Sequence, residues 1–194
     1  MRNFLKFTAV VALMLCTTAV MADEMKENLK ATKNAKSLIF ELSEISNNTN
    51  IQFMDSDNHV IYSSYASSKK GFRKKFDLSK LSEGVYTFKL DGAIKTVTYT
   101  VALDAEGVTV IDKVEYTKPV FTQRGNIVLV NLLNDTKEGV SINVYDSSDR
   151  LLFTEEVADS LTFEKAIDFG TAFEGEYTVT VKDAHGVYST IVTK

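Results

Sequence analysis

From residue 37 onward, apolar and polar residues alternate in short runs. In residues 72–76 (FRKKF) the two phenylalanines share one face with Lys74, while Arg73 and Lys75 take the other face. A period of two is the period of a β-strand, whose successive side chains point to opposite faces. In the first half of the chain the pattern predicts strands at residues 38–42, 50–53, 60–62, 72–76, 84–90, 94–103 and 108–116.

Turn residues separate these runs every 8–12 residues, a spacing typical of a β-sandwich or barrel. Residues 55–58 (DSDN) form one such predicted turn. Asp91 and Gly92 predict a two-residue hairpin turn, because glycine takes the positive φ that these turns need. No amphipathic helix of useful length interrupts the pattern, so the fold class is predicted to be all-β.

The chain also repeats itself. A shift of 91 residues, which brings Ile51 onto Ile142, keeps apolar positions and turn residues in register without a gap up to residue 90. The identities include Asp55 with Asp146, Phe72 with Phe163, Lys74 with Lys165, Asp77 with Asp168, Gly84 with Gly175, and Tyr86 with Tyr177. The apolar pattern also places Leu38 over Leu129, and the second copy is predicted to have a slightly longer turn at residues 183–186.

A repeat of this length suits a small independent domain rather than a solenoid unit. The only proline, Pro119, lies at the junction between the copies. We therefore predict two tandem immunoglobulin-like or fibronectin-like β-sandwich domains, at residues 37–118 and residues 119–194.

The first residues have the order of a secretory signal peptide. Arg2 and Lys6 precede an apolar run, and small residues follow up to Ala22, where we predict the cleavage. The apolar run is shorter than the ~20 residues of a membrane span. Lipid attachment at Cys16 is the less favoured alternative, because Leu15 before it is not small. Residues 23–36 are polar and are predicted to be a solvated leader or linker, with a short helix left open.

Composition narrows the possible chemistry. Cys16 is the only cysteine and would be lost with the signal peptide, which excludes disulfides, cysteine-bound zinc and a cysteine nucleophile in the processed chain. The net charge of −4 argues against general nucleic-acid binding, which depends on neutralising phosphates. No later apolar run is long enough for a transmembrane segment.

Three segments carry a resemblance to a known family. They are the strand that leads into an Asp-Ser turn (residues 143–152), the Asp-Leu step before Tyr86 (residues 77–86), and the final strand that ends in lysine (residues 188–194). Together they resemble the C-terminal sorting domain of the type IX secretion system of Bacteroidetes, and related immunoglobulin-like secreted modules of that phylum. The resemblance covers most of residues 38–103 and 127–194. It implies bacterial export and an immunoglobulin-like fold, and it supplies no catalytic residue.

Candidate catalytic and metal-binding residues are sparse. His59 and His185 are the only histidines, and each lies in or beside a predicted turn without a partner at ligand spacing. Nucleophile elbows, HExxH motifs and phosphate-binding glycine loops are absent from the sequence. We therefore predict a protein that is not an enzyme, with no catalytic residue, no cofactor and no metal site.

Two acidic turns, residues 55–58 and 146–149, leave weak calcium binding open. An EF-hand loop that begins at Asp55 would need glycine at its sixth position and glutamate at its twelfth, where Val60 and Ala66 stand. Asp, Asn and Ser are also the ordinary residues of turns, and we favour this interpretation.

The densest basic run contains Lys69, Lys70, Arg73 and Lys75. It could bind acidic glycans or lipopolysaccharide head groups, or it could be a solvated edge strand on which lysine discourages aggregation. The second copy does not keep this charge at residues 160–166, so the fold does not require it.

Tyr86 and Tyr177 follow glycine near the start of a strand. They could face a ligand, but we favour a role in which each hydroxyl anchors a corner of the sandwich. The absence of tryptophan makes a carbohydrate platform less favoured.

Taken together, the sequence predicts an exported, non-enzymatic binding or adhesion-type protein. It would be periplasmic, outer-surface or extracellular, with an unidentified protein or glycan of the cell envelope as partner. The alternative is a secretion-linked protein whose C-terminal repeat acts as a type IX-like sorting signal.

Overall fold

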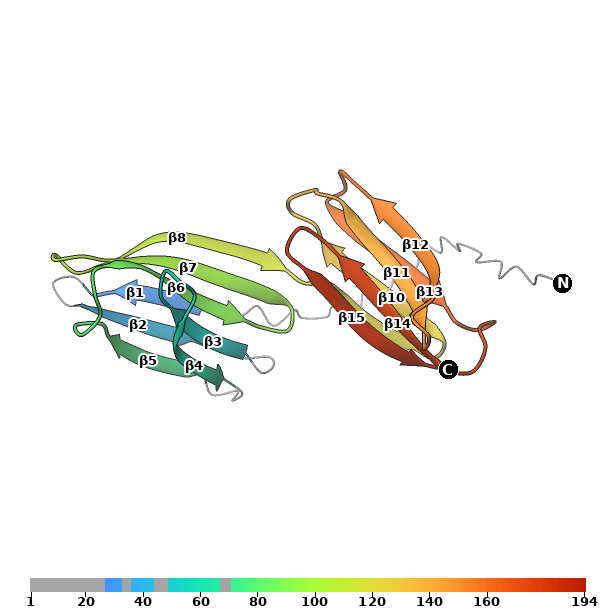
Figure 1. The fold of residues 1–194 in the computed structure, drawn as a ribbon, viewed down its shortest axis with the longest axis horizontal. Coiled ribbons are helices and arrows are strands. Elements are labelled where there is room, and N and C mark those ends of the chain that lie inside the picture. The colour runs from blue at the N-terminus through green and yellow to red at the C-terminus, as the bar shows by residue number, and fades with distance from the viewer. Residues whose placement is uncertain (1–26, 33–35, 44–48, 67–70) are drawn as a thin grey trace. The chain divides into compact units, whose positions relative to one another are not determined.

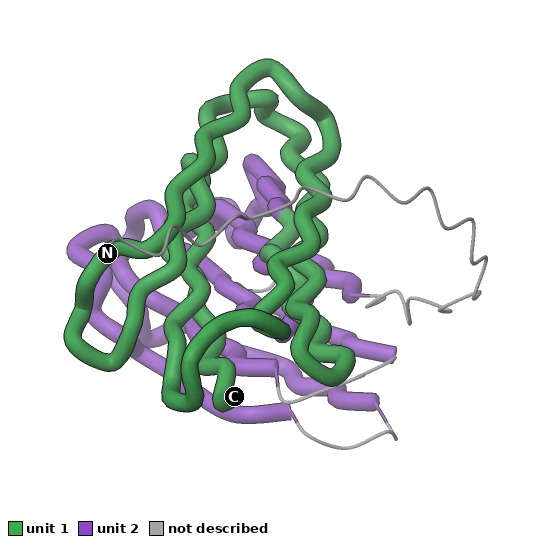
Figure 2. The backbone as a smooth tube through the Cα atoms, turned by 90° about the vertical axis from the view of Figure 1, so that its right-hand side faces the viewer, with its two compact units in different colours: residues 1–17, 117–194 green, residues 18–116 purple. Residues whose placement is uncertain are grey.

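The computed structural model describes residues 27–32, 36–43, 49–66 and 71–194, and these residues contain no helix. The predicted signal peptide and Cys16 lie outside the described residues. The chain divides between Tyr116 and Thr117 into two compact units, coloured purple and green in Figure 2. We call them the N-terminal and the C-terminal unit; the predicted boundary after Lys118 lies slightly beyond the division.

The described residues of the N-terminal unit form eight strands, whose arrangement Figure 1 shows. They are β1 (Glu27–Ala31), β2 (Ser37–Leu42), β3 (Thr49–Met54), β4 (Val60–Ala66), β5 (Phe72–Asp77), β6 (Gly84–Asp91), β7 (Lys95–Leu103) and β8 (Val108–Thr117), the last of which ends at the division. One sheet has the order β1-β2-β5, and the other has the order β4-β3-β6-β7-β8. Every strand predicted in this half of the chain is confirmed.

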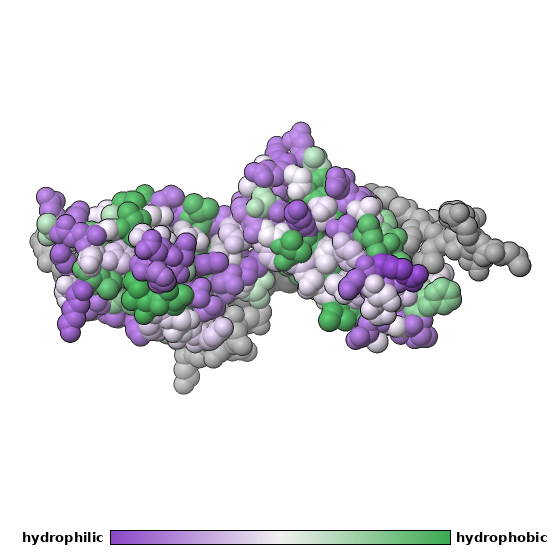
Figure 3. All heavy atoms as spheres, viewed as in Figure 1, coloured by the Kyte–Doolittle hydropathy of each residue, from purple (hydrophilic) through white to green (hydrophobic). Residues whose placement is uncertain are grey.

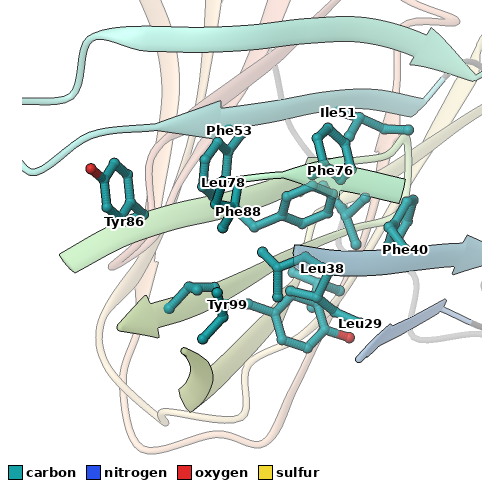
Figure 4. Close-up of a cluster of buried hydrophobic side chains, with 14 of the residues drawn as sticks. Leu29, Leu38, Phe40, Ile51, Phe53, Phe76, Leu78, Tyr86, Phe88 and Tyr99 are labelled. Atoms are coloured by element: carbon teal, nitrogen blue, oxygen red, sulfur yellow. The ribbon is translucent and has the colours of Figure 1, made fainter. Parts of the chain in front are cut away.

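The two sheets pack face to face around an aromatic core (Figure 4). Phe40 from β2 and Phe88 from β6 bridge the sheets, with their ring centroids 4.9 Å apart. Phe53 from β3 stacks on Tyr86 at 5.5 Å. Alternation along each strand sends these side chains inward, and burial of aromatic surface is the main favourable contribution to folding.

The predicted linker at residues 23–36 is wrong where β1 forms. This strand pairs with β2 over its whole length, and Leu29 lies opposite Phe40 in the ladder. Leu29 is 8% exposed and belongs to the core. A five-residue edge strand needs few apolar residues to be held in place, so its polar composition resembled that of a solvated segment.

The C-terminal unit contains seven strands. They are β9 (Val120–Arg124), β10 (Ile127–Leu133), β11 (Val140–Asp146), β12 (Leu151–Val157), β13 (Thr162–Asp168), β14 (Glu176–Lys182) and β15 (Val187–Thr193). The sheets have the orders β13-β10-β9 and β12-β11-β14-β15. Their inner faces share one core, so this unit is also a two-sheet sandwich.

The repeat predicted from the sequence is visible in backbone geometry. The β3–β4 ladder shifts register after Phe53, and the β11–β12 ladder shifts after the equivalent Val144. In the turns that follow, Asn58 and Asp149 take positive φ values of 61° and 57°. Earlier in the chain the shift is 90 rather than 91: Leu38 pairs with Phe76 as Val128 pairs with Ile167. The predicted match of Leu38 with Leu129 is therefore wrong by one residue.

The turn predictions for the next hairpins also need correction. Asp91 is the last residue of β6 and pairs with Thr96, so it does not belong to a two-residue turn. The turn is closed by the Gly92 N–H, which donates to the Lys95 carbonyl at 3.0 Å. In the other unit Asp183 donates to Gly186 at 3.0 Å, so both turns have the same length. The first turn was predicted too short because Ile94 resembles a strand residue. In the structure Ile94 lies in the turn and is 42% exposed.

Candidate binding surface

The basic strand β5 is an edge strand of its sheet. Phe72 and Lys74 are half-buried and Phe76 is buried, whereas Arg73 and Lys75 are exposed on the outer face, as predicted. Arg73 lies opposite Glu41 of β2, and its Nε approaches Glu41 Oε1 to 2.9 Å. This cross-strand ion pair neutralises part of the charge, so Lys75 contributes more to the surface potential than Arg73.

Lys75 lines a shallow hollow with residues from before β2 and after β5. The other lining residues are Lys36, Ser37, Asp77 and Ser79. The Ser37 hydroxyl is buried, and among the described residues it has no hydrogen-bond partner. The groups that an anion could reach in the hollow are therefore the two lysines and the exposed Ser79, a combination that suits a sulfate, phosphate or carboxylate group.

Asp77 partly offsets this positive charge. Its Oδ1 accepts a hydrogen bond from the Ser79 N–H at 3.0 Å. That backbone hydrogen bond is the main cause of the lowered pKa of Asp77, and the nearby charges of Lys75 and Lys80 act in the same direction. The carboxylate is thus engaged with its own turn, and Lys80 adds a further cation to the neighbourhood.

The structure describes two of the four predicted patch residues. Lys69 and Lys70 lie outside the described residues, so their contribution stays a prediction. Lys36 was missed in the sequence, because it is separated from β5 along the chain and reaches the same surface through the pairing of Ser37 with Asp77. Only the pairing register of β2 and β5 could have revealed it.

The C-terminal unit does not repeat this surface. The register of β10 and β13 places Glu164 and Ala166 where β5 has Arg73 and Lys75. It keeps Lys165 in place of Lys74. The Lys74 Nζ lies 3.9 Å from the Tyr62 ring centroid, and the Lys165 Nζ lies 5.5 Å from that of Phe153. These inner lysines cover aromatic faces and belong to the fold, whereas the outer lysines do not.

The acidic turns predicted near residues 55 and 146 are held by side chain–backbone hydrogen bonds. Asp55 Oδ1 accepts from the N–H groups of Asp57 and His59 at 3.0 and 2.8 Å. Asp146 Oδ1 accepts from Ser148 and Arg150 at 2.9 and 3.1 Å. The preferred interpretation of these residues as ordinary turn formers is confirmed.

Possible ligand atoms of Asp55, Asp57 and His59 lie within 4.8 Å of one another, in an exposed turn. The equivalent turn replaces the histidine by Arg150, whose NH2 group lies 2.6 Å from Asp146 Oδ2. A cation of the protein thus occupies the corresponding place, so the grouping is not a metal site shared by both units. His185 lies in a turn of the other unit, where its N–H donates to Asp183 Oδ1 at 2.8 Å.

Both predicted corner tyrosines are confirmed. The Tyr86 hydroxyl donates to the Ser82 carbonyl at 2.6 Å, and the Tyr177 hydroxyl donates to the Phe173 carbonyl at 2.8 Å. Each tyrosine is buried, with only 7% of its surface exposed. These hydroxyls therefore stabilise the corners of the two sandwiches and do not face a ligand.

A charge cluster around the buried side chain of Glu27 in the N-terminal unit was not predicted. The Glu27 side chain is 3% exposed, with its oxygens 2.9 Å from Lys113 Nζ and 3.5 Å from Lys95 Nζ. Glu115 joins at 3.2 Å from Lys113. The hydrogen bond to Glu27 is the main cause of the raised pKa of Lys113, and the hydrogen bond from Lys113 is the main cause of the lowered pKa of Glu115. The cluster ties β1 of one sheet to β7 and β8 of the other, which is a structural role.

Two-sheet sandwiches with this strand order and a corner tyrosine in each unit define an immunoglobulin-like class of β-protein. Residues 33–104 match the family model described as the secretion system C-terminal sorting domain. The resemblance predicted from the sequence is therefore confirmed for the N-terminal unit, over the segment from β2 to β7. No curated protein matches this chain.

One solved structure that is similar to this chain is the BSP domain of a biofilm-associated protein. It is 16% identical, and the match covers 86% of this chain and 29% of that chain with a TM-score of 0.26. A two-domain fibronectin type III segment from chicken tenascin is 8% identical over 87% of this chain and 100% of its own, with a TM-score of 0.31. A β-glucuronidase from an uncultured Clostridium species is 7% identical over 88% of this chain and 35% of its own, with a TM-score of 0.28. The chain thus spans under a third of the biofilm-associated structure.

Hydrophobic residues on the visible surface form separate patches among hydrophilic ones (Figure 3). Within the described residues, no helix is long and apolar enough to pass through a membrane.

Proposed function

We propose that the protein is an exported, non-enzymatic binding module whose N-terminal unit binds an anionic partner, of the acidic-glycan class, through β5. Export is supported by the match of residues 33–104 to the sorting-domain model. The observation that carries the binding role is the hollow in which Lys36 and Lys75 lie beside the exposed Ser79, with Asp77 bound to its own turn.

The comparison of the two units supports a specific role for this charge. Strands β1 to β7 have counterparts β9 to β15 that pair in the same order, yet the outer cations are present on β5 and absent from β13. A guard against aggregation would be equally useful on β13, which is also an edge strand. Acidic polymers carry repeated carboxylate or sulfate groups, which lysine recognises as a point charge.

A charge-reversal experiment tests the binding role. The double variant Lys36→Glu with Lys75→Glu is compared with Lys137→Glu with Lys182→Glu, two exposed lysines of the C-terminal unit. Both variants change the net charge equally. Affinity for heparin, used as a sulfated-polymer probe, is measured by calorimetry at two salt concentrations. We expect the first variant to lose about tenfold or more in affinity and the second to bind like the unaltered chain. Because salt screens the same lysine contacts that charge reversal removes, high salt should also weaken binding by the unaltered chain. Equal losses in both variants would contradict the proposal.

A second candidate function is favoured by the family match itself. The C-terminal unit repeats the strands of the matched segment, from β10 to β15, and could act as a sorting signal for the type IX secretion machinery. Cell fractionation with and without residues 119–194 tests this in a host that has the machinery. Retention of the shortened chain in the periplasm supports a sorting signal. Export of a shortened chain that resists proteolysis as a folded unit contradicts it.

A further inference from the structure

The two units differ at one sheet edge. In the N-terminal unit β7 lies between β6 and β8, whereas its counterpart β15 pairs, in the part of the chain that the structure describes, with β14 alone. The two strands are equivalent because Leu90 pairs with Val97 as Val181 pairs with Tyr188. The fold therefore accepts a further strand at this place, and in the C-terminal unit the described chain leaves that edge open.

The open edge lacks the features that protect edge strands. Natural edges carry charge, proline or a bulge that prevents pairing with another chain. β8 contains Asp112, Lys113 and Glu115, and β12, at the opposite edge of the β15 sheet, contains Glu155 and Glu156. β15 (VYSTIVT) has no charge and no proline. β4 is also uncharged, but among the residues that the structure describes, neither unit adds a strand beside β4 or its counterpart β12.

The outer face of β15 is apolar at two positions. Val187 and Ile191 are 65% and 66% exposed. The nearby cation Lys194 does not guard the edge, because its Nζ donates to the Gly170 carbonyl at 2.5 Å. β-branched residues along an exposed edge favour pairing with a strand of the same kind.

We propose that β15 is a self-association edge, at which it pairs in antiparallel fashion with β15 of a second copy of this chain. A strand meets its own copy about a two-fold axis, so the sequence must be compatible with itself when reversed. A two-fold axis at Thr190 satisfies this condition, because the inward-facing residues of one β15 then lie opposite the inward-facing residues of the other. The resulting pairs are Val187 with Thr193, Tyr188 with Val192, and Ser189 with Ile191, none of which opposes like charges.

A second copy of β15 fits this edge better than the other exposed strands of the protein do. β8 or β12 of another copy would place acidic or basic residues against an uncharged strand. The uncharged β4 lies at an edge where the described part of neither unit adds a strand, unlike the edge of β15. Pairing of two seven-residue strands buries less than the roughly 1,000 Å² that a stable interface needs. The dimer is accordingly weak and reversible, with a dissociation constant on the order of 10–100 μM. The inferred self-association does not depend on the anion-binding role proposed above.

Sedimentation velocity of the chain from residue 23 onward tests the inference over protein concentrations from about 5 to about 500 μM, a range that brackets such a dissociation constant. The double variant Ser189→Lys with Ile191→Lys places like charges opposite each other in the pair of Ser189 with Ile191, which occurs twice about the two-fold axis. Its matched control is Leu152→Lys with Thr154→Lys, two exposed outward positions on the opposite edge of the same sheet. We expect the unaltered chain and the control to shift toward a dimer, and the β15 variant to stay monomeric.

Hydrogen exchange provides a second measurement that needs no variant. Amides of β15 in the unaltered chain should exchange more slowly at high than at low protein concentration, while amides of β12 should not change. An unaltered chain that remains monomeric up to the highest concentration overturns the inference and leaves the edge to a strand from another protein. A dimer that forms equally in both double variants, or that leaves β15 unprotected, also overturns it.

Discussion

The two units fill equivalent core positions with different side chains. Three phenylalanines at the centre of the N-terminal core are replaced by valines in the C-terminal core, and all six side chains are at most 1% exposed. The equivalent pairs are Phe40 with Val130, Phe53 with Val144, and Phe88 with Val179. A change in the opposite direction occurs after β5 and β13, where Leu78 corresponds to Phe169 and both are buried.

This contrast shows which features the fold requires. The alternation of inward and outward residues, the turns after β3 and β11, and the corner tyrosines are common to both units. The identity of the core residues is not, since different apolar side chains can fill a core when the pattern of inward positions is kept. The units also differ at their sheet edges, where the N-terminal unit adds β8 and the buried Glu27 cluster, and the C-terminal unit leaves β15 open.

The largest expected effect on stability comes from truncating a side chain in the aromatic core. Phe88→Ala should destabilise the N-terminal unit by about 3–5 kcal/mol, because it removes buried surface and leaves a cavity. Val179→Ala, at the equivalent position, should destabilise the C-terminal unit less, because fewer buried atoms are lost. Urea unfolding followed by probes in each unit measures both. If Phe88→Ala costs no more than Val179→Ala, the aromatic core is not the stronger contributor.

The next effect concerns the charge cluster that only the N-terminal unit contains. Glu27→Gln removes a buried carboxylate that Lys95 and Lys113 share, and should cost about 1–2 kcal/mol because its charge-assisted hydrogen bonds are lost. The loss is limited because both lysines are partly exposed and keep Glu115 at 3.8 and 3.2 Å. Glu83→Gln is the matched control. Its carboxylate is 61% exposed and 4.0 Å from Lys36, so it should change the stability by less than about 0.5 kcal/mol. Equal effects in the urea transition of the N-terminal unit would contradict a role for burial.

The corner tyrosines are a feature that the two units share, so their removal should destabilise both units equally. Tyr86→Phe and Tyr177→Phe each remove one hydrogen bond from a hydroxyl to a carbonyl four residues earlier. Each should destabilise its own unit by about 1 kcal/mol. Denaturant unfolding of both variants measures this. A loss in one unit alone would mean that the two corners are not equivalent.

Local patterns explain which elements could be predicted from the sequence. Strand positions and the tyrosine corners follow from alternation and turn chemistry within a few residues. β1 could not be predicted, because its single buried residue, Leu29, stands among polar ones. The shift of the repeat before β3 was missed because one more residue separates Leu132 from Val140 than separates Leu42 from Thr49.

The sites show the same limit. Arg73 and Lys75 are adjacent in the basic run and could be identified together, whereas Lys36 joins them only through the pairing of β2 with β5. Glu27 meets Lys95 and Lys113 across the two sheets, at sequence separations that no local pattern reveals. Contacts that depend on register and on sheet packing required the structure.

The smallest expected effect separates the two acidic turns. The pKa of Asp146 is lowered mainly by its side-chain hydrogen bond with Arg150, and the pKa of Asp55 mainly by the backbone N–H of His59. Both folded-state pKa values lie below the ordinary value of 3.8. Each carboxylate therefore stabilises its unit above that pH, and the stabilisation is lost as the pH falls through the folded-state value.

The variants Asp55→Asn and Asp146→Asn should flatten this acid dependence, each in its own unit. Salt should distinguish them, because about 1 M NaCl screens exposed ion pairs over about 3 Å and weakens the contribution of Arg150 at Asp146. The backbone hydrogen bonds of Asp55 carry no such charge on the donor, and its side-chain partner His59 lies at 3.3 Å, farther than the 2.6 Å of Arg150 from Asp146, so Asp55 should be less sensitive. Urea midpoints of both units, measured near neutral pH and below 3.8 with and without salt, test this. Equal salt sensitivity at both turns would contradict the assignment of Arg150 as the main cause at Asp146.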